Sequence, residues 1–136
     1  MKLAFIDSDV LLDVILNRPT FYSASAQILS LPIDSGYNFC TAVHTLINVH
    51  YFTKKHLGAE TAIEAIKLLS KQLRVLGEDA TTINDAIASD FKDFEDAVQY
   101  FAAKNAGVDL IITRNIKDYK NSTIPVLTAE QFLNTL

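Results

Sequence analysis

Two apolar runs, each followed at once by polar residues, are the clearest pattern along the chain. They are Leu3-Ala4-Phe5-Ile6-Asp7 and Asp109-Leu110-Ile111-Ile112-Thr113. Nearly continuous apolar runs of this length are typical of strands that are buried on both faces of a parallel sheet. Shorter runs predict three further strands, at residues 37–41, 73–76 and 125–127.

Between these strands, apolar residues recur at the three- and four-residue spacing of a helix. The spacing predicts helices over 9–16, 21–31, 43–56, 59–71, 83–88 and 91–106, a turn or short helix over 115–119, and a final helix after Thr128. Gly107 is a typical helix stop, and Thr128 with Gln131 has the pattern of a helix-capping pair. Strands that alternate with helices predict an α/β fold: a three-layer α/β/α sandwich around a central, mostly parallel sheet of about five strands.

Length and composition narrow the class of protein. With 136 residues, the chain is expected to form one domain over 1–136. It has no run of ~18 apolar residues, and Asp7 and Asp9 interrupt the pattern of a secretory leader, so we expect no membrane span. The single cysteine, Cys40, excludes an intramolecular disulfide, which makes a cytoplasmic location the expected one. The net charge of −4 argues against broad DNA binding, but a nuclease needs only local basic contacts.

Acidic residues cluster at three places that follow a strand or begin a helix. The clusters are Asp7-Ser8-Asp9, Asp93-Phe94-Glu95-Asp96 and Thr113-Arg114-Asn115-Ile116-Lys117-Asp118. In an open parallel sheet, strand ends and helix starts share one edge, and ligands bind in the crevice at that edge. We therefore expect the three clusters to converge there.

Carboxylates with no cysteine or histidine among them are hard oxygen ligands. Such ligands suit Mg²⁺ or Mn²⁺ rather than zinc. A metal-activated water that attacks a phosphodiester in line is the reaction that such sites typically support.

Several of the acids also have a structural interpretation. Asp7 is placed to serve as a turn residue or a helix cap, and Asp93 is expected to cap its helix. Asp13 is expected on a solvated helix face or as a local cap, in preference to a contact with the site. For Asp96 a functional role is preferred, because it adjoins an expected core stripe made of Phe94, Ala97, Val98 and Phe101.

The ordered set of motifs resembles the PIN domain, the ribonuclease fold shared by the VapC toxins. The resemblance covers nearly the whole chain and rests on the segments Phe5–Asp13, Thr41–Asn48, Asp93–Gln99, Ile112–Tyr119 and Ile124–Leu133. It implies metal-dependent cleavage of an RNA substrate, with Mg²⁺ or Mn²⁺ as the cofactor. It also implies an antitoxin protein as partner and a homodimer, for which aromatic residues around Tyr51-Phe52 are a candidate contact.

The resemblance further implies roles for individual residues. The implied catalytic metal ligands are Asp7, Asp96 and a residue of the segment after the fourth strand, for which Asp118 and Asn115 are the candidates. The implied supporting residues are Ser8, Asp9, Asn48, Asp93 and Thr113, and the implied substrate contacts are Arg114 and Lys117.

Two positions depart from the pattern of the family. Asn48 stands where the family usually has Glu, and Asn115 stands where many members have an acid. Asn can coordinate a metal through its carbonyl oxygen but brings no charge, so metal affinity, or the binding of a second metal, is expected to be reduced. A PIN domain that binds RNA or a partner protein without cutting is therefore an alternative function.

Two other classes share parts of the pattern. A haloacid-dehalogenase-like phosphatase would use Asp7-Ser8-Asp9 as its nucleophile motif, but it needs a Lys and a further acidic pair well after the strand over 109–113, where too little chain remains. A phosphoacceptor receiver domain would need adjacent acids after the first strand and a Lys after the last, which here ends at Val126-Leu127-Thr128.

Overall fold

The five strands form one parallel sheet. The computed structural model describes residues 1–32 and 34–136. The strand order is β3-β2-β1-β4-β5, and every neighbouring pair is parallel. The strands are β1 (Lys2–Ile6), β2 (Tyr37–Ala42), β3 (Arg74–Leu76), β4 (Leu110–Ile112) and β5 (Val126–Leu127). Each predicted strand is present, with ends that differ by at most one residue from those predicted.

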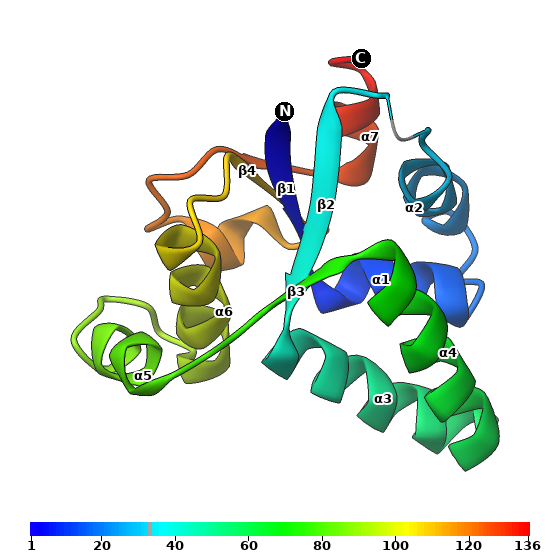
Figure 1. The fold of residues 1–136 in the computed structure, drawn as a ribbon, viewed down its shortest axis with the longest axis horizontal. Helices are drawn as coiled ribbons and strands as arrows, with labels where there is room; N and C mark the ends of the chain where they lie inside the picture. The colour runs from blue at the N-terminus through cyan, green and yellow to red at the C-terminus, as the bar shows by residue number, and fades with distance from the viewer. Residues whose placement is uncertain (33) are drawn as a thin grey trace.

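Helices cover both faces of the sheet. They are α1 (Ser8–Ile15), α2 (Tyr22–Leu29), α3 (Val43–Leu57), α4 (Ala59–Gln72), α5 (Ala80–Ile87), α6 (Phe94–Asn105), the short 3₁₀ helix η1 (Ile116–Tyr119) and α7 (Ala129–Leu133). Figure 1 shows the sheet nearly edge-on, with α5 and α6 on one side and α1, α2 and α4 on the other. The predicted three-layer α/β/α arrangement is therefore confirmed.

The central strand β1 supplies side chains to two cores. Ala4 and Ile6 face the side where they pack with Val49 of α3 and neighbouring residues. Phe5 faces the other side and packs with Tyr100 of α6. Because successive strand residues point to opposite faces, a strand covered on both sides must be apolar throughout, and these three β1 residues are fully buried.

The register of β1 against β4 decides which residues meet at the carboxyl edge of the sheet. Ile6 is paired with Ile112, so the next residues along the two strands, Asp7 and Thr113, lie side by side. The Asp7 N–H donates to the Ile112 carbonyl at 3.0 Å, and the Thr113 N–H donates to the Leu127 carbonyl at 2.9 Å. The first and third acidic clusters are thus brought together by ordinary strand pairing.

Helix α6 begins later than the sequence pattern predicts. It starts at Phe94 rather than at Phe91, because the Asp93 side chain caps it by accepting a hydrogen bond from the Asp96 N–H at 3.1 Å. The prediction that Phe94 belongs to the core is wrong, since Phe94 is 51% exposed. The first turn of α6 lies beyond the carboxyl ends of the strands (Figure 1), so it does not pack against the sheet.

Capping residues set the ends of other helices as well. Helix α5 starts at Ala80 and not near residue 83, because Asp79 and Thr82 form a capping box. The predicted capping pair of Thr128 and Gln131 is confirmed at the start of α7. Gly107, the predicted helix stop, follows α6 with a φ of 74°, a value that glycine adopts more readily than other residues.

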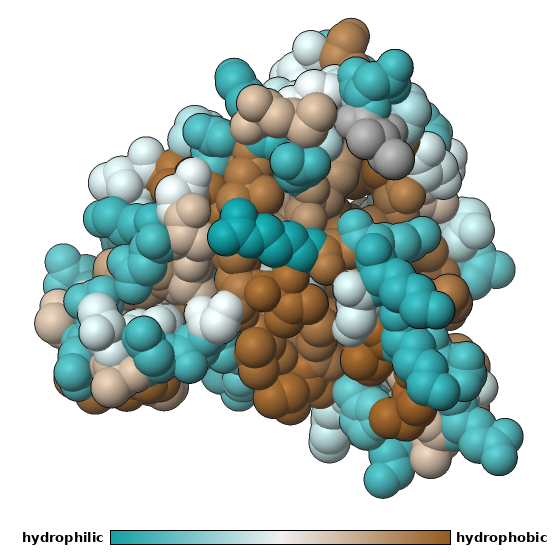
Figure 2. All heavy atoms as spheres, viewed as in Figure 1, coloured by the Kyte–Doolittle hydropathy of each residue, from teal (hydrophilic) through white to brown (hydrophobic). Residues whose placement is uncertain are grey.

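The face turned to the viewer in Figure 2 carries an apolar area over the start of α3 and β3. Val43, Ile47 and Val75 are exposed in this part of the fold. Tyr51 and Phe52, farther along α3, are also exposed. In the part of the chain that the structure describes, no helix combines the length and the apolar character needed to cross a membrane.

Candidate active site

Asp7 lies directly after β1 and is 7% exposed. Its Oδ1 accepts a hydrogen bond from the Ser8 backbone N–H at 2.7 Å, so the interpretation of Asp7 as a helix cap is confirmed. Its Oδ2 accepts hydrogen bonds from the hydroxyls of Thr113 and Tyr119, each at 3.0 Å. A helix cap requires only the first of these contacts, so the two hydroxyl donors indicate a second role for this carboxylate.

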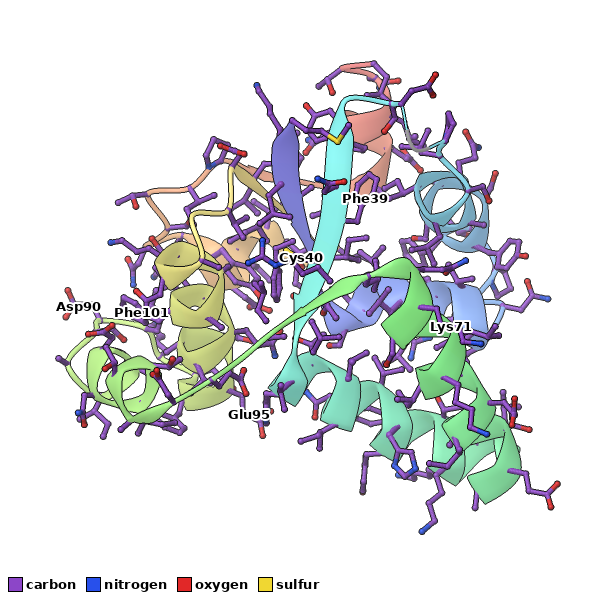
Figure 3. The ribbon with its side chains drawn as sticks, viewed as in Figure 1. Phe39, Cys40, Lys71, Asp90, Glu95 and Phe101 are labelled. Atoms are coloured by element: carbon purple, nitrogen blue, oxygen red, sulfur yellow. The ribbon has the colours of Figure 1, made fainter. Side chains whose placement is uncertain are left out.

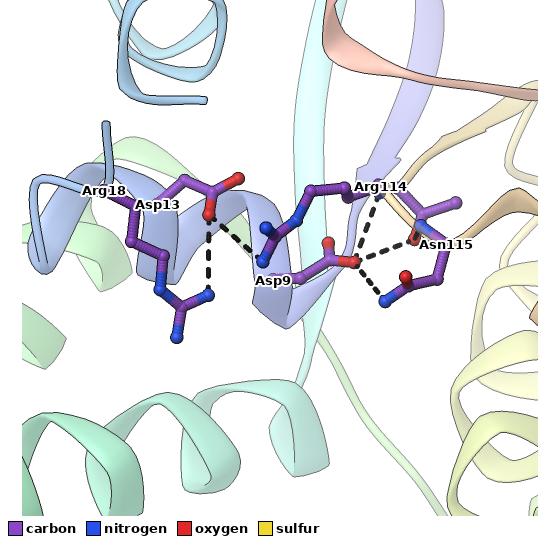
Figure 4. Close-up of polar contacts among 6 residues, drawn as sticks. Asp9, Asp13, Arg18, Arg114 and Asn115 are labelled. Atoms are coloured by element: carbon purple, nitrogen blue, oxygen red, sulfur yellow. Dashed lines mark hydrogen bonds and ion pairs between the residues drawn. The ribbon is translucent and has the colours of Figure 1, made fainter. Parts of the chain in front are cut away.

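Asp9, in the first turn of α1, holds the segment that follows β4. Its Oδ2 accepts hydrogen bonds from the Arg114 backbone N–H at 3.2 Å, from Asn115 Nδ2 at 3.0 Å and from the Thr113 hydroxyl at 3.3 Å (Figure 4). Its Oδ1 is buried, and no residue in ranges 1–32 and 34–136 donates a hydrogen bond to it. A buried carboxylate oxygen without a partner is costly unless a cation or an ordered water reaches it.

Asp96 and Asp118 line the same hollow, which has a volume of about 280 Å³. Asp96 is half-buried in the first turn of α6, and Asp118 is exposed on η1. The other charged side chains around the hollow are Lys92, Asp93, Lys117 and Lys120. The second and third acidic clusters therefore converge, and three lysines surround them.

Burial and neighbouring carboxylates raise the pKa of Asp9 and of Asp96. Burial, together with the negative charges of Asp93, Asp7 and Asp118, raises the pKa of Asp96 to about 7. For Asp9, burial and the charge of Asp7 together raise the pKa to about 7. For Asp7 itself, burial raises the pKa against the hydrogen bonds that lower it. Carboxylates that repel one another at partly buried positions are typical of functional sites.

The acidic residues do not form a closed cage. Within the described residues, no three carboxylate, imidazole or thiol groups are arranged so that they could hold a metal ion. Both carboxylate oxygens of Asp7 already accept hydrogen bonds, from Ser8, Thr113 and Tyr119. The candidate site is thus a converging but open set of carboxylates.

Other residues expected at the site occupy different positions around it. Asn115 turns its amide nitrogen toward Asp9, and Asp93 caps α6 as expected. Lys117 lines the acidic hollow. Asn48 is half-buried on α3, and no hydrogen bond joins it to the acidic clusters within the described part of the chain.

The sequence pattern predicts Asp13 on a solvated helix face. This prediction is wrong, because Asp13 is only 1% exposed. Its Oδ1 forms ion pairs with the guanidinium groups of Arg18 at 3.4 Å and Arg114 at 3.3 Å (Figure 4). The Arg114 guanidinium also lies over the Phe21 ring, 4.1 Å from its centroid. Arg114 reaches α1 from the far end of the sequence, which the helical pattern around Asp13 does not reveal.

A further polar cluster joins α3 to α6 at the same edge of the sheet. The His44 backbone N–H donates to Glu78 at 3.0 Å, and His44 Nε2 lies 3.7 Å from Glu95 Oε2. Figure 3 shows Glu95 at the start of α6. Deeper in the interface, the Thr45 hydroxyl donates to the Gln99 side-chain oxygen at 3.2 Å. These contacts fix the start of α6, which carries the second acidic cluster.

Tyr119 is a site residue that is absent from the sequence-based set. It is 2% exposed, and its hydroxyl donates to Asp7 Oδ2. Burial, followed by the nearby Asp7 charge, raises the pKa of Tyr119 well above its ordinary value, so that it remains a neutral donor. The sequence indicated it only through its place directly after Asp118, because a tyrosine there is equally typical of a core residue.

The fold and the site together define a class of protein. An aspartate after the central strand, acids at the start of α6 and a polar turn after β4 converge on one edge of a parallel sheet. The family model of the PIN domain matches residues 4–117. The chain belongs to the PIN domain family.

Particular relatives include ribonucleases and toxin–antitoxin proteins. The chain is 28% identical over 133 residues to ribonuclease VapC1 of Aquifex aeolicus strain VF5, a match that covers 94% of this chain and 91% of that protein. The solved structure of VapBC-1 from nontypeable Haemophilus influenzae is similar with a TM-score of 0.71 at 16% identity, covering 94% of this chain and 98% of that one. A toxin–antitoxin complex from Klebsiella pneumoniae is similar with a TM-score of 0.67 at 21% identity, covering 93% and 97%. The two structural matches show a shared fold.

Proposed function

We propose that the protein is an endoribonuclease that hydrolyses RNA phosphodiester bonds with Mg²⁺ or Mn²⁺ bound at the carboxyl edge of the sheet. The observation that carries the proposal is the convergence of Asp93 and Asp118 with the half-buried Asp96 around one hollow, where burial and the neighbouring charges raise the pKa of Asp96 to about 7. A cation stabilises such a concentration of negative charge. The name of the Aquifex aeolicus relative, a ribonuclease, supports the same activity.

The donors present fit a hard divalent cation. The candidate ligands Asp7, Asp96 and Asp118, with the side-chain carbonyl of Asn115, all offer oxygen atoms. The unpartnered Asp9 Oδ1 is a further buried oxygen that a cation or its water would satisfy. Because the acids do not form a cage within the described residues, binding requires a change of side-chain rotamer at Asp96 or Asp118. When bound, the metal would neutralise phosphate charge and activate a water.

The protein's own residues hold the site in a defined state. The Thr113 and Tyr119 hydroxyls stabilise the ionised form of Asp7 and fix its orientation. Lys117, beside the acidic hollow, is placed to contact an RNA phosphate. Asn48 adds no charge, so we propose weaker metal binding than a glutamate at this position would give.

We further propose an antitoxin protein as partner and a homodimer. Solved structures of the same fold include toxin–antitoxin proteins. Val43, Ile47 and Tyr51 recur at four-residue spacing along α3 and are exposed, so they offer a second copy an apolar stripe. The Ile47→Asp variant should lower the apparent mass in size-exclusion chromatography, whereas Lys55→Asp at the end of α3 should not.

Cleavage of labelled single-stranded RNA tests the proposed activity. The purified protein should cut some members of a mixed-sequence RNA pool in Mn²⁺ or Mg²⁺ and stop in EDTA. Asp7→Asn and Asp96→Asn should abolish cutting, while Asp90→Asn, which changes an exposed acid outside the clusters, should not. If wild type and the Asp7 and Asp96 variants bind RNA equally and none cuts, the protein is a binding module.

A further inference from the structure

A second cavity, of about 220 Å³, lies between α1, α2 and the start of α7. Its lining includes Val10, Asp13, Phe21, Ala24, Arg114 and Ala129. The proposed phosphodiester chemistry uses only the carboxylates at the carboxyl edge of the sheet, here called the acidic edge, and gives this cavity no role. Its mixture of small apolar residues, an aromatic ring and a guanidinium group is typical of a ligand pocket.

Arg114 connects this cavity to the acidic edge. Its backbone N–H donates to Asp9 Oδ2 at 3.2 Å, so the backbone belongs to the candidate active site. Its side chain lines the cavity, over Phe21 and beside Asp13. A strand whose phosphate lies at the acidic edge would therefore have a neighbouring nucleotide near the cavity.

Phe21 and Arg114 form a ready-made stacking surface. The guanidinium lies 4.1 Å from the centroid of the Phe21 ring, and its ion pair with the buried Asp13 holds it in place. Both groups remain accessible to a ligand, since Phe21 is 39% exposed and the Arg114 side chain is 30% exposed. Aromatic rings and arginine planes are the surfaces on which proteins stack the bases of single-stranded RNA.

We propose that this cavity binds one nucleobase of the RNA strand, next to the scissile phosphate and stacked against the Phe21–Arg114 pair; the proposal rests on the proposed ribonuclease function. A volume of about 220 Å³ is smaller than the ~300–1,000 Å³ of pockets for drug-sized ligands. It suits a single base whose sugar and phosphate remain outside. The apolar side chains of Val10, Ala24 and Ala129 favour the flat face of a base over a free phosphate.

RNA oligonucleotides that lack one base test this proposal. Binding of a labelled short RNA and of derivatives with a single abasic site is measured by fluorescence anisotropy in EDTA, where metal-dependent cutting does not run. In the wild type, one abasic position should weaken binding about tenfold, which corresponds to ~1.4 kcal/mol of stacking. Phe21→Ala should bind the intact RNA about tenfold more weakly and show no further loss with the abasic RNA.

Matched variants separate stacking from a general structural effect. Tyr22→Ala, which changes an equally exposed aromatic residue outside the cavity, should bind like wild type and keep the abasic penalty. Phe21→Leu, which keeps an apolar side chain but has no ring, should behave like Phe21→Ala. The unfolding midpoints of all variants are measured alongside.

Each outcome decides one of the two proposals. An abasic penalty in Phe21→Ala equal to that of wild type, or no abasic penalty at any position in wild type, would overturn the nucleobase site. If the penalty depends on Phe21 but wild type cuts no RNA in Mn²⁺ or Mg²⁺, the nucleobase site stands and the ribonuclease proposal fails.

Discussion

Replacing Asp96 with asparagine should stabilise the metal-free protein. The substitution removes a negative charge from a half-buried position where burial and four neighbouring acids raise the pKa from an ordinary 3.8 to about 7. Because each unit of pKa shift corresponds to ~1.4 kcal/mol, the gain in unfolding free energy above pH 7 can be at most ~4 kcal/mol. Solvent screens a half-exposed group, so we expect a gain in unfolding free energy of ~1–2 kcal/mol at pH 8.

The gain should depend on pH with a defined sign. A carboxyl group whose pKa is raised by folding binds its proton more tightly in the folded state, so it destabilises the fold progressively as the pH rises from 3.8 toward about 7. The wild type carries this penalty and the Asp96→Asn variant does not. Near pH 4 the wild-type side chain is largely protonated in the folded protein, and the two proteins should have almost equal stability.

Urea denaturation followed by circular dichroism, in EDTA at pH 4 and pH 8, measures this difference. Asp90→Asn is the matched control, because it removes an exposed acid outside the three clusters. The account of charge repulsion is refuted if Asp96→Asn is less stable than wild type at pH 8, or if its stability changes no more than that of Asp90→Asn. It is also refuted if the gain in unfolding free energy is the same at both pH values.

Four further substitutions test the site and the core. Tyr119→Phe removes a hydrogen bond to the Asp7 carboxylate; since such bonds contribute ~1.5–3 kcal/mol, the acid limb of the pH–rate profile for RNA cleavage should move upward by about one pH unit. An unmoved limb would show that the hydroxyl does not stabilise the ionised carboxylate. Phe132→Ala should cost ~3–5 kcal/mol in urea denaturation, because Phe132 is fully buried, whereas Phe94→Ala should cost less than ~0.5 kcal/mol at its exposed position. Equal losses would contradict the assignment of the core. Asn48→Glu should lower the Mg²⁺ concentration that gives half-maximal cleavage, and unchanged or weaker Mg²⁺ dependence would show that this side chain does not serve the site.

The sheet was predictable from the sequence because its strands are buried on both faces. β1 and β4 appear as continuous apolar runs, and their parallel pairing then determines that Asp7 and Thr113 meet at one edge. The convergence of Asp96 with Asp7 was also predictable, since helix starts and strand ends share that edge. These features depend only on local pattern and on the rules of parallel sheets.

The features that were not predictable depend on contacts between distant parts of the chain. Asp13 was expected in solvent, but Arg114, from the opposite end of the sequence, covers it and pairs with it. Phe94 has the spacing of a core residue, yet it lies in a turn of α6 that extends past the sheet. The role of Tyr119 depends on its position at the end of η1, from which its hydroxyl donates to Asp7, a residue more than one hundred positions earlier in the chain. The spacing of residues along one helix or turn does not show which distant residues will contact them.

A crystal soaked in Mn²⁺ tests the central claim most directly, because manganese scatters anomalously and replaces magnesium at oxygen-rich sites. The account predicts an anomalous peak in contact with Asp7 and Asp96, with the Asp96 side chain turned toward Asp7. It predicts no such peak in crystals of the Asp96→Asn variant. The absence of a peak at millimolar Mn²⁺ in wild-type crystals, or a peak that touches neither carboxylate, would contradict the proposal that this edge of the sheet is a divalent-metal site.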